Sequence, residues 1–282
     1  MPRPSREALG LAERFELALD SAPPPGRSGE RLARSGGAGT EFHDSRPYQL
    51  GDDVRSIDWR AFARSDQLMV RVWREELLAR VEVLLDVSRS MGIDPRKAQL
   101  AVDLAQVFAL SAQHNGSSAR IVPVGARALP LAPEEFEARG VEFDSREPFD
   151  AGLREALEHV RRGCVVLVIS DFLFPHAPRE LLAPLATRAG ALGCVQVLSH
   201  DERAPQPGRA LRLVDCESDA SLDLVLDARV VEGYLARLTA LNAALSEECR
   251  RAGARFASLG AEAPLEELAR GPLLEAGLLA AR

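Results

Sequence analysis

Three oxygen-bearing side chains follow one another closely in the stretch VEVLLDVSRSMG, residues 81–92. An apolar run reaches Asp86, and Ser88 and Ser90 follow at alternate positions. One carboxylate and two hydroxyls, with no sulfur or imidazole among them, suit a hard divalent cation such as Mg²⁺ or Mn²⁺. The same residue types also favour turns and helix caps, so the stretch allows both a metal site and a capped helix.

A second candidate ligand stands at the end of another apolar run. The sequence CVVLVISDF, residues 164–172, reads as a buried strand with Asp171 at its end. In open parallel sheets, ligands bind outside the carboxyl ends of the strands. If the two strands are neighbours, the two carboxylates and two hydroxyls converge on one point. The predicted site for Mg²⁺ or Mn²⁺ is therefore Asp86, Ser88, Ser90 and Asp171.

The elements that must position these residues alternate between strand and helix. Between the two candidate strands, Asp94 and Pro95 are typical of a helix start, and the apolar spacing predicts a helix to about His114. Further strands and helices alternate to the end of the chain. Strands that are apolar on both faces and alternate with helices form a parallel sheet covered on each side. Residues 78–282 are therefore predicted to form a doubly wound, mostly parallel α/β domain.

The chain before this domain has a different composition. Residues 1–40 are predicted to be a short amphipathic helix followed by a mobile linker rich in Pro, Gly, Ser and Arg. Residues 41–77 are polar with spaced aromatic residues and lack a clear period. We expect this preamble to be irregular, apart from a strand within 67–76, and to pack on the α/β core.

Charged and aromatic residues cluster within the preamble. They are Arg55, Asp58, Trp59, Arg60 and Arg64. Tryptophan and arginine serve both as anchors for a partner and as internal staples. Because the charges are mixed in sign and closely spaced, we favour an internal network with Trp59 buried, and keep a docking surface as the alternative.

Composition limits the classes of function. The chain has 282 residues and a net charge of −7, which gives no electrostatic support for nucleic-acid binding. No uncharged apolar stretch reaches 18 residues, and the N-terminus lacks a secretory h-region, so we expect no membrane span and a cytoplasmic location. The four cysteines form no C-x-x-C pair, as expected in a reducing compartment. Lys97 is the only lysine, which we interpret as an effect of codon composition.

Other catalytic motifs are absent from the sequence. It has no G-x-S-x-G elbow and no phosphate-binding G-x-x-x-x-G-K-[ST] loop. Its five histidines show no H-E-x-x-H spacing. These absences argue against the common hydrolase, nucleotidase and zinc-protease sites.

The strand-end pattern resembles the von Willebrand factor type A domain. D-x-S-x-S after the first core strand and Ser-Asp after a later one are similar to its metal-ion-dependent adhesion site, over about residues 78–260. The preceding YQLGDDVRSIDWRAFARSDQLMVRVWREE, followed by LLDVSRSMG, resembles the bacterial domain-of-unknown-function family fifty-eight. That resemblance implies a type A fold, a MoxR-type AAA+ ATPase as partner and no established catalytic activity.

The resemblance also implies roles for single residues. Asp86, Ser88 and Ser90 match the first loop of the adhesion site, and Asp171 matches the acidic residue of its last loop. The middle loop of the type A domain supplies a threonine, whereas the corresponding FDSREPFDAGLREAL has none. Two residues of that stretch are candidates to replace it, Ser145 and Asp150.

These observations favour a non-enzymatic protein-binding module. We expect it to be a partner or adaptor of a MoxR-type AAA+ ATPase, with a divalent cation that bridges to a partner carboxylate. One alternative is a metal-free scaffold in which Asp86 and the serines only cap a helix. A second is a Mg²⁺-dependent phosphoester hydrolase, against which the lack of an evident general base or phosphate cradle argues.

Overall fold

Five parallel strands form the central sheet. Strand β6 (Val165–Ser170) is buried along its whole length, and β4 (Arg80–Asp86) is buried from its second residue onward. A computed structural model describes residues 1–19, 41–49, 57–74, 80–215 and 221–282. The sheet has the order β10-β7-β6-β4-β5, and the other strands are β5 (Ser118–Val124), β7 (Ala191–Leu198) and β10 (Arg255–Gly260).

The strand order places the two candidate strands side by side. From β4 the chain passes to β5 on one side, and β6 then pairs with β4 on the other side. The direction of winding therefore reverses at β4 and β6, which is where open α/β sheets bind ligands. This confirms the predicted doubly wound parallel sheet and the expected adjacency of the two strands.

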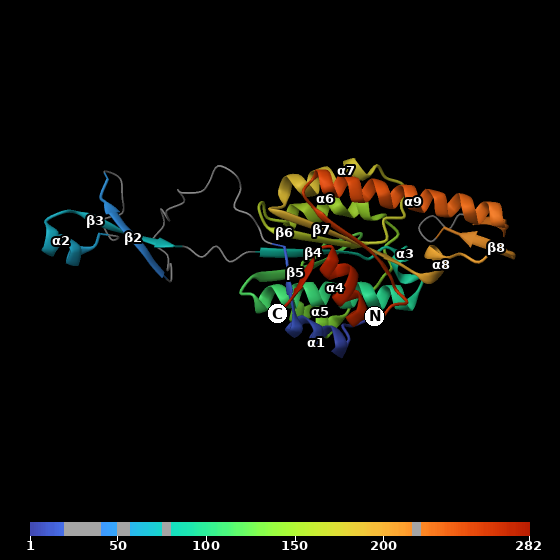
Figure 1. Cartoon of the computed structure of the whole chain (residues 1–282), viewed down its shortest axis with the longest axis horizontal. Helices are drawn as coiled ribbons and strands as arrows, with labels where there is room; N and C mark the ends of the chain where they lie inside the picture. The colour runs from blue at the N-terminus through green and yellow to red at the C-terminus, as the bar shows by residue number, and fades with distance from the viewer. Residues whose placement is uncertain (20–40, 50–56, 75–79, 216–220) are drawn as a thin grey trace. The chain divides into compact units, whose positions relative to one another are not determined.

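Helices cover both faces of the sheet (Figure 1). Alternate residues of β4 enter different cores, with Val83 and Leu85 in one and Leu84 in the other. The first core contains α1 (Arg6–Arg14), α4 (Pro95–His114) and α5 (Pro133–Arg139). The second contains α6 (Phe149–His159), α7 (Pro178–Arg188) and α9 (Ala228–Arg251).

Helix α4 starts as its sequence predicts. The Asp94 side chain accepts a hydrogen bond from the Arg96 N–H at 2.8 Å, and Pro95 occupies the first turn. A short helix, α3 (Arg89–Gly92), fills the turn between β4 and α4. The site residues thus lie between a buried strand and a capped helix.

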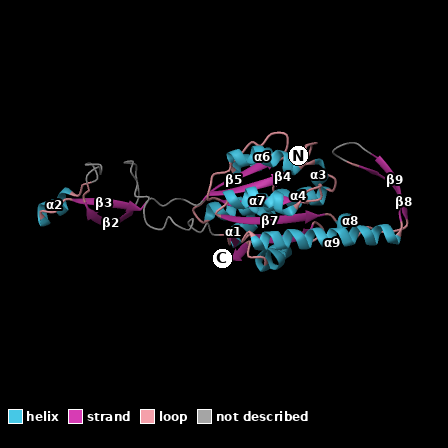
Figure 2. Ribbon diagram, turned by 90° about the horizontal axis from the view of Figure 1, so that it is seen from above, coloured by secondary structure: helices cyan, strands magenta, loops and turns pink. Residues whose placement is uncertain are grey.

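Smaller elements extend the carboxyl edge of the sheet. Helix α8 (His200–Arg203) follows β7, and the antiparallel pair β8 (Arg209–Val214) and β9 (Ser221–Leu226) leads into α9. Figure 2 shows α9 running past the strands of the sheet toward β8 and β9. Among the described residues, no helix is long and apolar enough to cross a membrane.

Two segments far apart in sequence join beside the first core. Strand β1 (Phe15–Leu17) pairs in antiparallel fashion with β11 (Leu279–Ala281). The sequence pattern predicts a first helix over about residues 5–20 and a terminal helix from about Leu265. Instead, α10 (Leu265–Leu268) and a π-helical turn (Ala269–Leu273) precede β11. Three-residue strands carry too little periodicity to be recognised within helical patterns.

The chain divides into two compact units. One contains residues 1–22 and 79–282, and the other contains residues 23–78. The composition of the sequence separates residues 1–40 from the α/β domain, whereas in the structure the first helix belongs with that domain. The predicted mobile linker lies mainly in residues 20–40, outside the described residues.

The second unit has more regular structure than its polar sequence indicates. Strand β2 (Glu41–Pro47) pairs in antiparallel fashion with β3 (Met69–Arg74), and α2 (Trp59–Ser65) lies between them in sequence. The predicted strand within 67–76 is confirmed as β3. The expectation of an otherwise irregular preamble is wrong, and its packing on the α/β core stays a prediction.

The helix α1 should contribute substantially to the stability of the α/β unit. Leu11 is fully buried against the core, so Leu11→Ala is expected to lower the free energy of unfolding by about 2–5 kcal/mol. The control is Glu13→Ala, at an exposed position of the same helix. Denaturant unfolding measures both, and equal stability of the two variants would contradict this role of α1.

Candidate functional site

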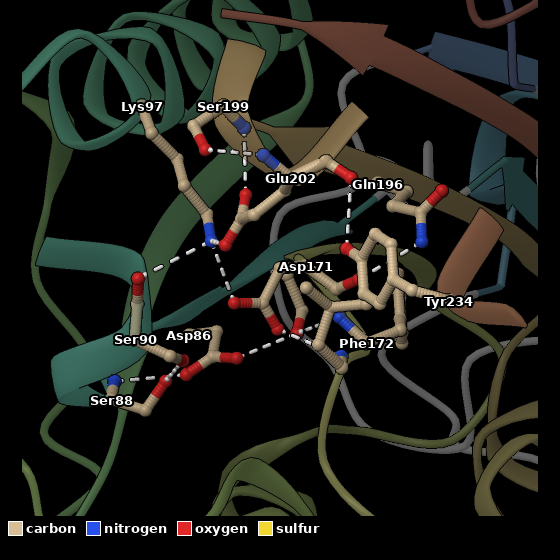
Figure 3. Close-up of polar contacts among 12 residues, drawn as sticks. Asp86, Ser88, Ser90, Lys97, Asp171, Phe172, Gln196, Ser199, Glu202 and Tyr234 are labelled. Carbon is tan, nitrogen blue, oxygen red and sulfur yellow. Dashed lines mark hydrogen bonds and ion pairs between the residues drawn. The ribbon is translucent and has the colours of Figure 1, made fainter. Parts of the chain in front are cut away.

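Asp86 joins the ends of the two central strands (Figure 3). Strands β4 and β6 pair through Leu85 and Ile169, so Asp86 stands beside Ser170. The Ser170 hydroxyl donates to Asp86 Oδ2 at 2.6 Å, and the Ser88 N–H donates to Asp86 Oδ1 at 2.9 Å. Asp86 is fully buried, so its carboxyl group is shielded from bulk water. The donors that hold it are both neutral.

The two serine hydroxyls face each other across the turn after β4. Ser88 Oγ and Ser90 Oγ are 2.9 Å apart. Ser88 is the residue before α3, but its side chain accepts no capping hydrogen bond from a backbone N–H of that helix. This observation argues against a purely capping role for Ser88, because its hydroxyl points to Ser90 instead.

Asp171 follows β6 and is also buried. Its Oδ1 accepts from the Leu173 N–H at 2.9 Å, and its backbone carbonyl accepts from Gln196 Nε2 at 2.9 Å. The next residue, Phe172, is buried with a φ of 55°, in the left-handed region that bulky residues rarely adopt. The turn that presents Asp171 is therefore held in a strained backbone conformation by the packing around it.

Lys97 belongs to this site but was not among the ligands predicted from the sequence. It extends from α4, and its ammonium donates to Asp171 Oδ2 at 2.8 Å and to Glu202 Oε1 at 2.7 Å. A third contact, to the Ser90 carbonyl, is 3.2 Å long. Its side chain is only 1% exposed. One signal was available in the sequence: of its 35 Lys and Arg residues, Lys97 is the only lysine, and all the others are arginine.

Burial and neighbouring charges shift the pKa values of Asp86 and Lys97. Burial raises the pKa of Asp86 to about 7, and the negative charge of Asp171 adds to the rise. Burial acts to lower the pKa of Lys97, but the carboxylates of Asp171 and Glu202 outweigh it and hold that pKa above its usual value. The site therefore favours added positive charge next to Asp86.

The middle loop reaches the site through its backbone. Ser145 forms a parallel bridge with Ser88, and its carbonyl accepts from the Arg89 N–H at 3.0 Å. Gly125 leaves room for this approach, because a Cβ there would lie 2.9 Å from the Ser145 Cβ. Of the two candidates to replace the missing threonine, Ser145 lies at the site, whereas Asp150 is exposed in the first turn of α6.

The donor set of the first loop fits a small divalent cation. Neighbouring oxygens of an octahedral Mg²⁺ shell lie about 3 Å apart, because each is about 2.1 Å from the ion. The 2.9 Å between Ser88 Oγ and Ser90 Oγ matches that spacing. Within the described residues, no three His, Cys, Asp or Glu side chains are placed to hold one ion, so a cation here depends on hydroxyls and water.

The preamble residues lie in the other unit. Asp58 caps α2 by accepting from the Arg60 and Ala61 N–H groups at 3.0 and 3.1 Å. Arg64 Nε donates to the Arg60 carbonyl at 3.2 Å. Trp59 is 60% exposed within its own unit, and its ring makes an edge contact with Phe62. Its burial against the α/β core stays a prediction. Arg55 lies outside the described residues.

The sequence matches one family over most of its length. The family model described as "Protein of unknown function DUF58" matches residues 44–243. The uncharacterized protein Mb1516 of Mycobacterium bovis is 27% identical over 256 residues, covering 82% of this chain and 78% of that protein. The uncharacterized protein Rv1480 of Mycobacterium tuberculosis matches to the same extent.

Two solved structures show a more distant likeness. The conserved hypothetical protein BatB from Bacteroides thetaiotaomicron is 15% identical, with a TM-score of 0.31, over 62% of this chain and 98% of that chain. An aerotolerance-related membrane protein from Bacteroides fragilis is 11% identical, with a TM-score of 0.31, over 61% of this chain and 99% of that one.

The raised pKa of Asp86 predicts a pH dependence of stability in EDTA. The folded protein holds this proton more tightly than the unfolded chain, whose aspartates have a pKa near 3.9. The resulting stability is fully present below about pH 4 and is lost as pH rises through about 7. Asp86→Asn should remove this loss, so its stability relative to wild type should rise between pH 5 and 8, on the order of 2 kcal/mol.

Urea unfolding at several pH values measures the difference. Asp94→Asn is the matched control, because it removes a nearby charge and keeps a residue that can cap α4. Parallel pH curves for wild type and Asp86→Asn would show that Asp86 does not titrate in this range.

Proposed function

We propose a function from the premise that this chain belongs to the family described as "Protein of unknown function DUF58", a description that assigns no activity. The chain is a protein-binding module. It holds a divalent cation, Mg²⁺ or Mn²⁺, at the carboxyl edge of its sheet and uses it to bind a carboxylate of a partner protein.

One observation carries this proposal. The hydroxyls of Ser88 and Ser90 lie 2.9 Å apart beside the buried Asp86, and the Ser88 side chain makes no cap bond to α3. A hydroxyl pair that only terminated a helix would be expected to bond its backbone N–H groups. The pair is instead spaced like adjacent ligands of a small cation.

The chemistry of the ligands favours a partner carboxylate. Hydroxyls are neutral ligands, so Asp86 neutralises only part of a divalent charge at the first loop. Asp171 lies beside Asp86 and adds negative charge, although its Oδ2 is shared with Lys97. Mg²⁺ keeps several waters in such sites, and an acidic residue of a partner can replace one of them. The resemblance to the von Willebrand factor type A domain supports the same arrangement.

The partner that the family resemblance suggests is a MoxR-type AAA+ ATPase. The cytoplasmic location and the lack of enzymatic activity stay predictions. The metal-free scaffold has one observation in its favour, because the Lys97 ammonium already supplies positive charge to Asp171. Metal binding therefore distinguishes the two functions directly.

Calorimetric titration with Mg²⁺ and Mn²⁺ tests the metal site. Wild type should bind at millimolar or lower concentration, and Asp86→Asn should weaken binding at least about tenfold through the loss of a ligand charge. Asparagine is chosen because alanine would leave the Ser170 hydroxyl and the Ser88 N–H without their buried acceptor. Ser88→Ala should weaken binding less, and Asp94→Asn should leave it unchanged. Absence of binding by wild type would favour the scaffold.

Partner capture tests the role of the cation. A purified MoxR-type ATPase from the same genome should bind the immobilised chain in Mg²⁺ and be released by EDTA. Asp86→Asn should abolish capture, whereas Asp94→Asn should retain it. Capture that survives EDTA and the Asp86 substitution would contradict a cation-mediated interface.

A further inference from the structure

We propose that Lys97 is a built-in cation that competes with the divalent ion for Asp171, and that it releases Asp171 and keeps Glu202 as its carboxylate partner when that ion binds. This inference rests on the proposed function, because it concerns regulation of the same site. It assigns roles to two residues, Lys97 and Glu202, that lie outside the predicted ligand set.

Lys97 needs an anionic partner in every state of the protein. Its side chain is 1% exposed, so water cannot solvate the ammonium fully. A buried charge that loses its only partner is strongly unfavourable. The ammonium can therefore release Asp171 only if another carboxylate is already within reach.

Glu202 is that second carboxylate, and the fold holds it in place. Its Oε2 accepts from the Ser199 N–H at 2.7 Å in a capping box, which leaves Oε1 for Lys97 at 2.7 Å. The Tyr234 hydroxyl of α9 donates to the Glu202 carbonyl at 2.8 Å, which ties α8 to α9. Figure 3 shows Lys97 between Asp171 and Glu202, with Glu202 on the side away from Asp86.

The remaining contacts of the ammonium allow this shift. Release of Asp171 Oδ2 leaves Lys97 bonded to Glu202 Oε1 and, at 3.2 Å, to the Ser90 carbonyl. An ammonium is compact and has three donors that can turn, whereas a guanidinium has a fixed planar fork. This difference gives a physical reason for lysine at this position in a chain that otherwise uses arginine.

The charges give the direction of the coupling. A divalent ion beside Asp86 and Asp171 is repelled by the Lys97 ammonium and competes with it for Asp171. Removing the ammonium should therefore strengthen metal binding. Removing the charge of Glu202 should weaken it, because Lys97 then depends more on Asp171.

Four variants test these opposite signs by calorimetric titration with Mg²⁺. Lys97→Met should bind more tightly than wild type and Glu202→Gln more weakly, within the roughly 5- to 150-fold range of coupled sites. Glu262→Gln is the control for a general loss of negative charge, because Glu262 pairs with Arg203 of the same helix α8. In the double variant, which combines Lys97→Met with Glu202→Gln, the second substitution should weaken Mg²⁺ binding less than it does in wild type, because the ammonium is absent.

The single lysine offers a direct spectroscopic readout. Lysine labelled with ¹⁵N gives one side-chain signal from Lys97 in the untagged chain. Saturation with Mg²⁺ should shift that signal in wild type. If Lys97→Met does not fold, Glu202→Gln and this signal still decide the question.

The outcomes separate this inference from the proposed function. Tighter binding by Lys97→Met and weaker binding by Glu202→Gln than by wild type would support competition between the two cations. Metal binding that is equal in all variants, with an unshifted Lys97 signal, would overturn the role of Lys97 and leave the metal site standing. No binding by any folded variant would overturn both.

Discussion

Two carboxylates withdrawn from water at the ends of neighbouring strands determine most of what lies at this edge of the sheet. Asp86 and Asp171 stand where β4 and β6 end, and both are buried. Two negative charges in a dry interior repel each other and must be protonated, hydrogen-bonded or neutralised. The Ser170 hydroxyl donates to Asp86, and the Lys97 ammonium donates to Asp171. The strained backbone at Phe172 belongs to the turn that presents Asp171.

This constraint also connects distant elements of the α/β unit. Lys97 comes from α4 beneath one face of the sheet, and Glu202 comes from α8 after β7. Through Tyr234, the same cluster reaches α9, which packs on the opposite face. A change in charge at the end of β4 therefore has a continuous path of polar contacts to helices on both sides. Networks of hydrogen bonds and ion pairs of this kind are one physical route by which distant elements can be coupled.

The sequence was sufficient for the sheet and for the adjacency of the strand ends that carry Asp86 and Asp171. Strand β6 is apolar up to its last residue, Ser170, and polar residues at the ends of such strands mark the edge where open parallel sheets bind ligands. Lys97 could not be recognised because a charged residue within a helical pattern is normally placed on its solvated face. Only the third dimension shows that it points inward to Asp171.

The pairing of β1 with β11 has a consequence for the order of events during synthesis. Leu17 and Leu279 are partners in this short sheet, yet almost the whole chain separates them. Residues near the N-terminus leave the ribosome first and must remain without their strand partner while more than 250 residues are added. During that interval the exposed edge of β1 is available to chaperones or to other nascent chains. Completion of this α/β unit therefore waits for the synthesis of β11, and contacts of such long sequence separation form slowly.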